Sequence, residues 1–374
     1  MTKKNLIKIS LTASYVFILV TLGCIPEDSL QWNADGSTAC RPLDVPCDPD
    51  KETTCGGIHD SAFDGDVDIA IGLVFAAMQW PEYRNAAISW LLKMECEIDT
   101  AYDGKWNYPS NGDTWDKNCS GYPGSPCTYA QGQVLNVHMD YYPPGYFRVF
   151  GDFLEHLMDP TQSTANERAG HRQFWYHTAS TVYEMYERCY DNPNIVPALA
   201  GSSGDNISPC SGGDGGPYEW PRYQWRVGID AAWFGNRQDF VENAAGSSRH
   251  YSGKSEMQAK IDLIQDFYAN FSKNNPVEPN ANRFSTICDG LGSSGLVTSC
   301  DPGSGHNSVF VNTAMCSYVS IFDDDGKTTG NIRREAIEEA VSTTIQNTRV
   351  YQESIGVYSL MFLTGNFPNP LTVP

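Results

Sequence analysis

Three aspartates stand at alternate positions where a long apolar segment begins. Asp64, Asp66 and Asp68 lead into a run of Ile, Leu, Val, Phe and Ala that extends to Trp80, and Pro81 follows. One acidic side chain can cap a helix, and all three are favoured near the positive end of a helix. Capping accounts for one or two of these acids. We therefore expect carboxylates at this helix start that serve binding or catalysis.

A second carboxylate lies in an aromatic segment much later in the chain. Glu219 is followed by Trp220 and, three residues on, by Arg222. A carboxylate beside an arginine can serve as an oriented base, and the simpler alternative is a surface Glu–Arg ion pair. Exposed aromatic rings in such segments are surfaces on which sugar rings stack.

These segments resemble conserved motifs of glycoside hydrolase family 8. Residues 62–70, Ala-Phe-Asp-Gly-Asp-Val-Asp-Ile-Ala, resemble the family signature Ala-Ser/Thr-Asp-Ala/Gly-Asp, which continues two residues later with Ile-Ala. Phe63 stands where Ser or Thr is usual, and Gly72 where Ser or Ala is usual. The resemblance implies that Asp64 binds and orients the sugar at the cleavage point, and that Asp66 also contacts substrate.

The remaining roles follow from two further segments of the same resemblance. Residues 140–148 resemble the family segment whose first tyrosine holds the attacking water, a role that falls on Tyr141. Residues 218–230 resemble the segment that supplies the general base, which falls on Glu219 although the family has Asp there. The longer side chain matters, because misplacing a reacting group by ~1 Å can lower a rate about a hundredfold.

Other family positions imply sugar contacts. Arg222 matches the arginine beside the base, and Trp220 lies between the two. Trp32 matches a tryptophan that stacks on sugar before the signature. Residues 350–367 resemble the closing helix of the family, so the resemblance spans about residues 30–367.

The general acid of the family has no counterpart in this sequence. The resemblance places it on a Glu in a Ser/Thr-Glu-Gly-Gln-like motif well before the Trp32 segment, whereas the 29 residues before Leu30 contain a single glutamate, Glu27, outside any such motif. An N-terminally truncated or mis-started chain is the favoured explanation. Loss of catalysis with retained sugar binding, and replacement by Asp66 or Asp68, stay open.

The expected activity is endo-acting, inverting hydrolysis of a β-1,4-linked polysaccharide. Inversion uses one carboxylic acid and one carboxylate about 6.5–9.5 Å apart. Cellulose or another β-glucan is the first substrate expectation, with xylan or chitosan as further possibilities. The alternative is a catalytically impaired carbohydrate-binding or structural surface or fibre protein on a hydrolase scaffold.

Helical periodicity dominates the chain and predicts an all-α fold. Segments of this kind are 66–80, 85–96, 146–158, 173–190, 225–234, 256–271 and 332–345. Long aromatic-bearing loops are expected over 105–133, 192–221 and 274–304. The resemblance implies an (α/α)6 toroid, incomplete at its N-terminus, with disulfide-stapled loops. A helical toroid of another sugar-active family would make the motif around Asp64 a coincidence.

The N-terminus reads as an export signal. Lys3, Lys4 and Lys8 precede a short apolar run that ends at Gly23. We expect a signal peptide over 1–23, a single domain over 24–374, and a secreted, cell-surface or periplasmic location. No later run is long enough for a membrane span. A lipid anchor on Cys24 remains an alternative, and no oligomeric state is assigned.

Composition narrows the partners. The formal net charge of −20 disfavours nucleic acid and anionic lipid, which leaves a polysaccharide as the expected partner. The 12 cysteines suit disulfides in an exported protein. The cysteines lack paired Cys-x-x-Cys spacing, and the histidines form no metal-binding motif. We therefore expect neither a metal nor a cofactor.

Overall fold

A computed structural model describes the helical body of the chain. The described residues are 63–97, 99–101, 106–108, 135–138, 141–189, 199–203, 206–208, 220–235, 241–243, 250–252, 259, 261–262, 264–266, 281–287, 306, 308–319, 330–346 and 350–366. The expected signal peptide, Cys24, Trp32 and Glu219 lie outside them.

The first described elements form a helical hairpin. Helix α3 (Phe63–Gln79) is followed by a 3-10 turn, η2 (Pro81–Tyr83), and by α4 (Arg84–Glu97). Pro81 ends α3 because proline lacks the N–H that would continue the helix. The indole Nε1 of Trp90 on α4 donates a hydrogen bond of 3.3 Å to the backbone carbonyl of Asp66. The sequence prediction of two helices over 66–80 and 85–96 is confirmed.

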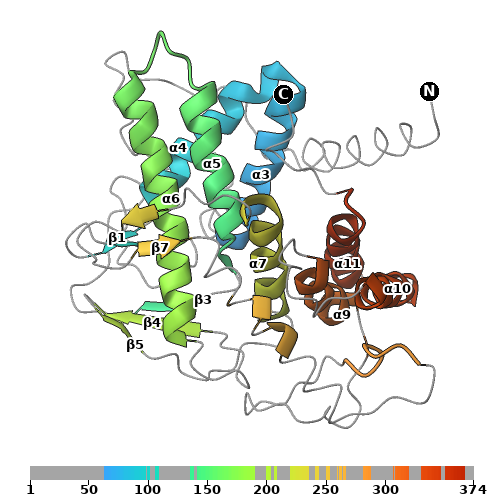
Figure 1. The fold of residues 1–374 in the computed structure, drawn as a ribbon. Coiled ribbons are helices and arrows are strands. Elements are labelled where there is room, and N and C mark those ends of the chain that lie inside the picture. The colour runs from blue at the N-terminus through green and yellow to red at the C-terminus, as the bar shows by residue number, and fades with distance from the viewer. Residues whose placement is uncertain are drawn as a thin grey trace, which may run out of the picture.

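Two long helices pack beside this hairpin. Helix α5 (Pro144–Leu157) is buried around its whole circumference in its first two turns, as expected of a central helix. Helix α6 (Ala165–Cys189) packs along it, and Figure 1 shows the two side by side. A capping box starts α6: Thr164 N–H donates to the Glu167 carboxylate, and Glu167 N–H donates to Thr164 Oγ1.

Aromatic side chains hold α3, α5 and α6 together. On α5, Phe147 stacks on Trp175 of α6 at a centroid distance of 5.6 Å, and Phe150 meets the same indole edge-on at 5.1 Å. Phe63, at the first position of α3, contacts the Phe147 ring at 6.2 Å. Phe63, one of the two residues that depart from the family signature, is therefore a core residue and packs the first turn of α3 against α5.

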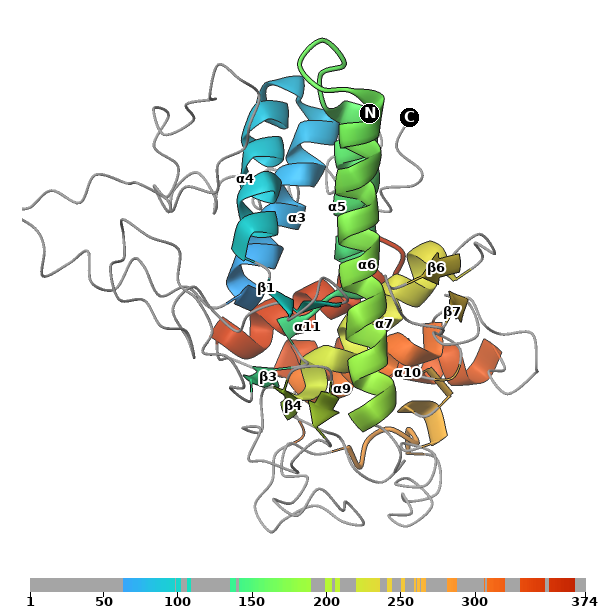
Figure 2. The same ribbon diagram turned by 90° about the vertical axis from the view of Figure 1, so that its left-hand side faces the viewer.

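The remaining helices form a second group. Helix α7 (Trp220–Phe234) packs against α5 and against α9 (Ser308–Met315), and η4 (Cys316–Val319) follows α9. Helices α10 (Gly330–Gln346) and α11 (Val350–Leu363) complete the group, and in Figure 2 they lie across the direction of α6. The Trp225 ring of α7 stacks on Tyr358 of α11 at 6.3 Å with an interplanar angle of 8°.

Short strands accompany the helices. They form three antiparallel sheets: β1 (Asp99–Ala101) with β2 (Trp106–Tyr108); β3 (Leu135–His138), β4 (Leu199–Ser203) and β5 (Asn206–Ser208) in that order; and β6 (Val241–Asn243) with β7 (His250–Ser252). The helical class is confirmed. The expectation of uninterrupted loops over 105–133 and 192–221 is wrong where β2, β4 and β5 form and where α7 begins at Trp220, because backbone pairing stabilises strands too short to show alternation.

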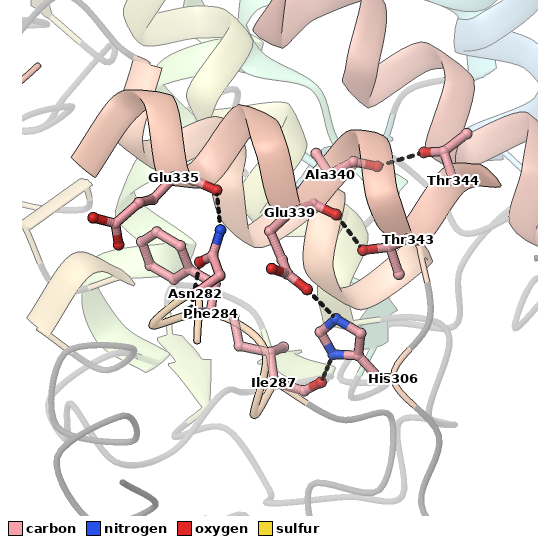
Figure 3. A network of polar contacts seen from close by, with 9 residues as sticks. All are labelled: Asn282, Phe284, Ile287, His306, Glu335, Glu339, Ala340, Thr343 and Thr344. Atoms are coloured by element: carbon pink, nitrogen blue, oxygen red, sulfur yellow. Dashed lines mark hydrogen bonds and ion pairs between the residues drawn. The ribbon is translucent and has the colours of Figure 1, made fainter. Parts of the chain in front are cut away.

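A polar network joins the α10 helix to the segments before it (Figure 3). His306 Nε2 lies 2.8 Å from the Glu339 carboxylate, and His306 Nδ1 faces the backbone carbonyl of Ile287. The Asn282 amide donates to the carbonyl of Glu335 at 2.7 Å. These hydrogen bonds attach residues 281–287 and His306 to α10.

The structure tests the expectations about cysteines and membrane spans only for the residues that it describes. Cys316, the first residue of η4, is a buried free thiol. Cys96 and Cys189 lie in helices whose side chains at those positions are not described, and the other nine cysteines lie outside the described residues, so disulfides stay a prediction. Among the helices that the structure describes, none combines the length and apolar character needed to cross a bilayer.

Candidate functional site

Residues from three separate segments of the sequence meet at the start of α3. Asp64 lies in the first turn of α3, Tyr141 lies just before α5, and Arg222 lies in the first turn of α7. Arg222 Nη1 donates to Asp64 Oδ2, and the Arg222 guanidinium lies over the Tyr141 ring, 5.1 Å from its centroid. The Asp64 side chain is 18% exposed and that of Arg222 is 10% exposed. A partly accessible cluster of carboxylate, guanidinium and phenol results, which we call the outer tier.

The same arrangement recurs one helical turn further along. Arg226 donates from Nη1 and Nη2 to the two carboxylate oxygens of Asp68, at 2.8 and 3.3 Å. Its guanidinium lies over the rings of Tyr146, at 5.5 Å, and Trp225, at 5.0 Å. We call Asp68, Arg226 and Tyr146 the inner tier. Its arginine is 1% exposed, whereas the Asp68 side chain is 40% exposed.

The electrostatics of the inner tier follow from that burial. Burial opposes the charge of Arg226, but the nearby carboxylate of Asp68 more than offsets it, so the pKa of the guanidinium is raised. Burial also raises the pKa of Tyr146, and the negative charge of Asp68 adds to this effect. Tyr146 is therefore a neutral phenol packed beneath a permanently charged arginine.

A third cluster of the same residue types lies deeper. Asp230, on α7, accepts a hydrogen bond of 3.2 Å from Arg148 Nε and one of 2.6 Å from the Tyr183 hydroxyl. Arg148 is 2% exposed and Asp230 is fully buried. Burial raises the pKa of Asp230, and Arg148 and Tyr183 act in the opposite direction. This buried tier joins α5, α6 and α7 beneath the site.

Helical spacing explains why the tiers are stacked. Positions 222, 226 and 230 are four residues apart on α7 and share one face, as do positions 64 and 68 on α3. Each tier is therefore displaced by about one helical pitch, ~5.4 Å, from the next. The α5 helix packs against both α3 and α7, so Tyr146 on α5 lies under Arg226 and Tyr141, just before α5, lies under Arg222.

The structure brings together part of the site predicted from the sequence. Asp64, Tyr141 and Arg222 form the outer tier, and Asp66 lies in the same turn of α3. Trp220 is the first residue of α7, with its side chain outside the described part, as are Glu219 and Trp32 altogether. The motif resemblance pairs Arg222 with Glu219, and this pairing stays a prediction. In the described part of the chain, Arg222 bonds Asp64 and lies over the Tyr141 ring.

The inner and buried tiers were not predicted from the sequence. Arg226 and Asp230 lie in the quoted motif, and Asp68 lies in the quoted signature, but none received a partner. Their four-residue spacing on two helices was the available signal. Partner choice depended on how α3, α5 and α7 pack, and spacing alone does not specify this.

The outer tier suits recognition of a polar neutral ligand. An arginine-bound carboxylate keeps acceptor positions for hydroxyl groups, and the adjacent phenol can donate or accept a hydrogen bond. Among the described residues, no group of three or more His, Cys, Asp or Glu side chains is arranged to hold a metal ion.

Proteins of similar sequence include endoglucanases. No family model matches the chain. Endoglucanase C of Ruminiclostridium cellulolyticum is 25% identical over 319 residues, which cover 83% of this chain and 53% of that protein. Endoglucanase A of Acetivibrio thermocellus is 24% identical over 329 residues, which cover 86% of this chain and 53% of that protein. The chain thus spans about half the length of these relatives.

A solved structure shares the fold. The apo structure of a β-1,3-1,4-glucanase from Paenibacillus sp. X4 superposes with a TM-score of 0.54 at 17% identity, covering 83% of this chain and 68% of that one. The helical body is therefore a fold of the kind found in glycoside hydrolases. The endoglucanase relatives agree with the resemblance of the sequence motifs to glycoside hydrolase family 8.

Proposed function

We propose that this protein is a glycoside hydrolase acting on a β-linked polysaccharide, by inverting endo-hydrolysis of β-1,4 bonds. Cellulose or another β-glucan is the preferred substrate, with xylan or chitosan as further candidates. The observation that carries the proposal is the outer tier, in which residues of three family-like motifs, Asp64, Tyr141 and Arg222, contact one another. The names of the endoglucanase relatives support the choice of a β-glucan.

Each residue has a role that its chemistry allows. Asp64 accepts hydrogen bonds from the hydroxyls of the sugar at the cleavage point, while Arg222 fixes the carboxylate from the opposite side. Tyr141 and Glu219 hold the attacking water, and Glu219 takes its proton as general base. Glu219 directly precedes α7 and stands three residues before Arg222, so the same arginine can serve both carboxylates.

Further residues extend the substrate contact. Trp32 and Trp220 supply aromatic faces for neighbouring sugar units, and Asp66 adds a carboxylate in the turn that carries Asp64. No residue is assigned to the proton donor. Hydrogen bonds that strengthen as the sugar distorts stabilise the transition state more than the bound substrate, and this difference raises kcat.

The wider setting belongs to the same proposal. Residues 24–374 form one domain of (α/α)6 type with an open substrate groove, exported by a signal peptide over 1–23. The helical pairs α3–α4 and α5–α6 are supporting observations, since the toroid is built from such pairs.

Reducing-sugar release tests the proposal. The full chain is incubated with soluble β-glucan, xylan and chitosan, beside its Asp64→Asn and Glu219→Gln variants. We expect release from one polymer, and a loss of about 100-fold or more in each variant, the usual scale for removal of an oriented charged group. Glu338→Gln on α10 is the control, because Glu338 is an exposed acid (60%) outside the site, and its activity should match the unaltered chain.

Two further results would decide between alternatives. An inverting enzyme releases a product whose new anomeric centre is α, which proton NMR detects before mutarotation. No release from any polymer would reject the hydrolase. Retardation of that inactive chain in a polysaccharide affinity gel would then favour the carbohydrate-binding scaffold.

A further inference from the structure

We propose that Asp68 and Arg226 are positioning residues, whose ion pair holds Asp64 and Arg222 in the arrangement that the reaction requires. The inference rests on the proposed function for its catalytic part. Its structural part, a mechanical coupling between the inner and outer tiers, stands independently.

The geometry of the outer tier is repeated in the inner tier. Asp64 and Asp68 are four residues apart on α3, and Arg222 and Arg226 are four residues apart on α7. Asp64 bonds Arg222, and Asp68 bonds Arg226. Tyr141 lies beneath the Arg222 guanidinium, and Tyr146 lies beneath that of Arg226. Two acid–arginine pairs one turn apart fix the register and the relative rotation of two helices, which a single pair cannot do.

The acid–arginine pairs of the two tiers differ in geometry and burial. In the inner tier both terminal nitrogens of Arg226 bond both oxygens of Asp68, a fork-to-fork geometry that constrains orientation as well as distance. Arg226 is also buried in contact with two aromatic rings, those of Tyr146 and Trp225, which restrict its position further. Asp64, in contrast, must leave acceptor positions open for substrate. The inner tier therefore supplies the rigidity that a working carboxylate cannot supply for itself.

Removal of the Asp68 carboxylate affects both stability and geometry. It leaves the guanidinium of Arg226, which is 1% exposed, without the carboxylate that it bonds, so a loss of stability is expected beside any loss of rate, and the test has to separate the two. A shift of ~1 Å at a reacting group can lower the rate about a hundredfold. Since α3 and α7 are helices, a change of register at the inner tier moves the outer tier directly.

The test compares Asp68→Asn with a matched cluster elsewhere. Asp152 on α5 accepts bonds from Arg172 Nε at 2.9 Å and from the Tyr176 hydroxyl at 2.8 Å, and the Arg172 guanidinium lies 4.1 Å from the Tyr176 ring centroid. Asp152→Asn thus breaks the same kind of cluster outside the site. We expect Asp68→Asn to lower kcat about 10- to 100-fold with KM changed less than about threefold. Asp152→Asn should leave both unchanged.

Two variants separate positioning from simple stabilisation. Arg226→Lys keeps the charge but loses the fork, so it should lower kcat on a scale similar to that of Asp68→Asn. In an Asp64→Asn background, Asp68→Asn should lower kcat less than about twofold, because Asp68 acts through Asp64. Equal kcat in Asp68→Asn and Asp152→Asn, or multiplicative losses in the double variant, would overturn the inference.

A chain without hydrolase activity would still decide the structural part. The melting temperatures of Asp64→Asn, Asp68→Asn and the double variant form a thermodynamic cycle. Coupled tiers predict a loss in the double variant clearly smaller than the sum of the single losses. Additive losses would show that the tiers are independent and would reject the inference, while inactivity by itself would reject only the proposed function.

Discussion

Gly145 on α5 and Asp230 on α7 approach so closely that a β-carbon at position 145 would lie 2.9 Å from the α-carbon of Asp230. The nearby atoms belong to the backbone and β-carbon of Asp230, so moving a flexible side chain would not relieve the clash. One turn further along α5, Arg148 reaches the Asp230 carboxylate. The glycine therefore sets the spacing at which the buried tier can form beneath the site.

Gly145→Ala should destabilise the protein. The added methyl group must push α5 from α7, and overpacking of this kind lowers the free energy of unfolding by about 1–3 kcal/mol. Chemical denaturation measures this change. Gly170→Ala on α6 is the control, since a β-carbon there meets nothing within 4 Å, and replacing an exposed helical glycine by alanine should stabilise by about 0.5–1 kcal/mol. Equal midpoints for Gly145→Ala and the unaltered chain would contradict the close contact.

Asp230→Ala should be among the most destabilising single changes. It leaves the guanidinium of Arg148 buried without its carboxylate, and breaking a buried ion pair in this way lowers the free energy of unfolding by about 3–5 kcal/mol. Tyr183→Phe removes only the hydroxyl that donates to Asp230, so a smaller loss of about 1.5–3 kcal/mol is expected. Urea unfolding ranks the two variants, and the reverse order would reject this account of the buried tier.

His306 should make stability depend on pH. Its Nδ1 faces a carbonyl and its Nε2 faces a carboxylate, both acceptors, so both ring nitrogens must carry protons. Burial opposes the imidazolium, but the bonds to Glu339 and to Ile287 more than offset it, and the pKa of His306 is raised. A raised pKa gives a stabilisation that is full below the unfolded value, ~6.5, and is lost as pH rises through the folded value.

Thermal unfolding at several pH values checks the His306 prediction. The unaltered chain should lose melting temperature between about pH 6 and pH 8.5, and His306→Gln should show a smaller loss over that range. His171, which bonds Glu95 and also has a raised pKa, adds a slope of the same sign that stays in the variant. The control is His156→Gln, because the His156 side chain is 72% exposed. Identical pH slopes for His306→Gln and the unaltered chain would refute the role of this bond.

Arg222→Lys should impair catalysis while the fold persists. Lysine keeps the charge but lacks the planar guanidinium that lies over Tyr141 and meets Asp64. We expect kcat to fall about 10- to 100-fold on the active polymer, with a melting temperature close to that of the unaltered chain. Arg334→Lys, at an exposed position of α10 (67%), should leave kcat unchanged. Full activity in Arg222→Lys would show that the guanidinium geometry is dispensable.

The helices were the most predictable part of the structure. The periodic segments over 66–80, 85–96, 146–158, 173–190, 225–234 and 332–345 all form helices, and Pro81 ends the first of them. Residues 308–315 were not predicted, although they form α9, because this helix is short and nearly all of its described part is buried. Its eight residues span too few turns to show a helical period, and the buried polar residues Asn312 and Thr313 interrupt any apolar pattern.

The sequence selected the residues of the outer tier but did not predict the contact between Asp64 and Arg222. Motif resemblance selected Asp64, Tyr141 and Arg222, since each lies in a segment whose residue types and spacing are distinctive. It paired Arg222 with the nearest acid in sequence, Glu219. Glu219 lies outside the described residues, so that pairing stays a prediction. The structure shows that Arg222 also bonds Asp64, which is 158 positions away along the chain.

The sequence by itself determined which segments are helical, which residue types could do chemistry, and how many residues separate them on each helix. These are local properties, set by backbone sterics and side-chain periodicity. Only the tertiary structure decided which acid meets which arginine, why Gly145 must lack a side chain, and that Phe63 belongs to the core. Those outcomes depend on the packing of α3, α5 and α7, where contacts between residues distant in sequence select one register from several that local preferences allow.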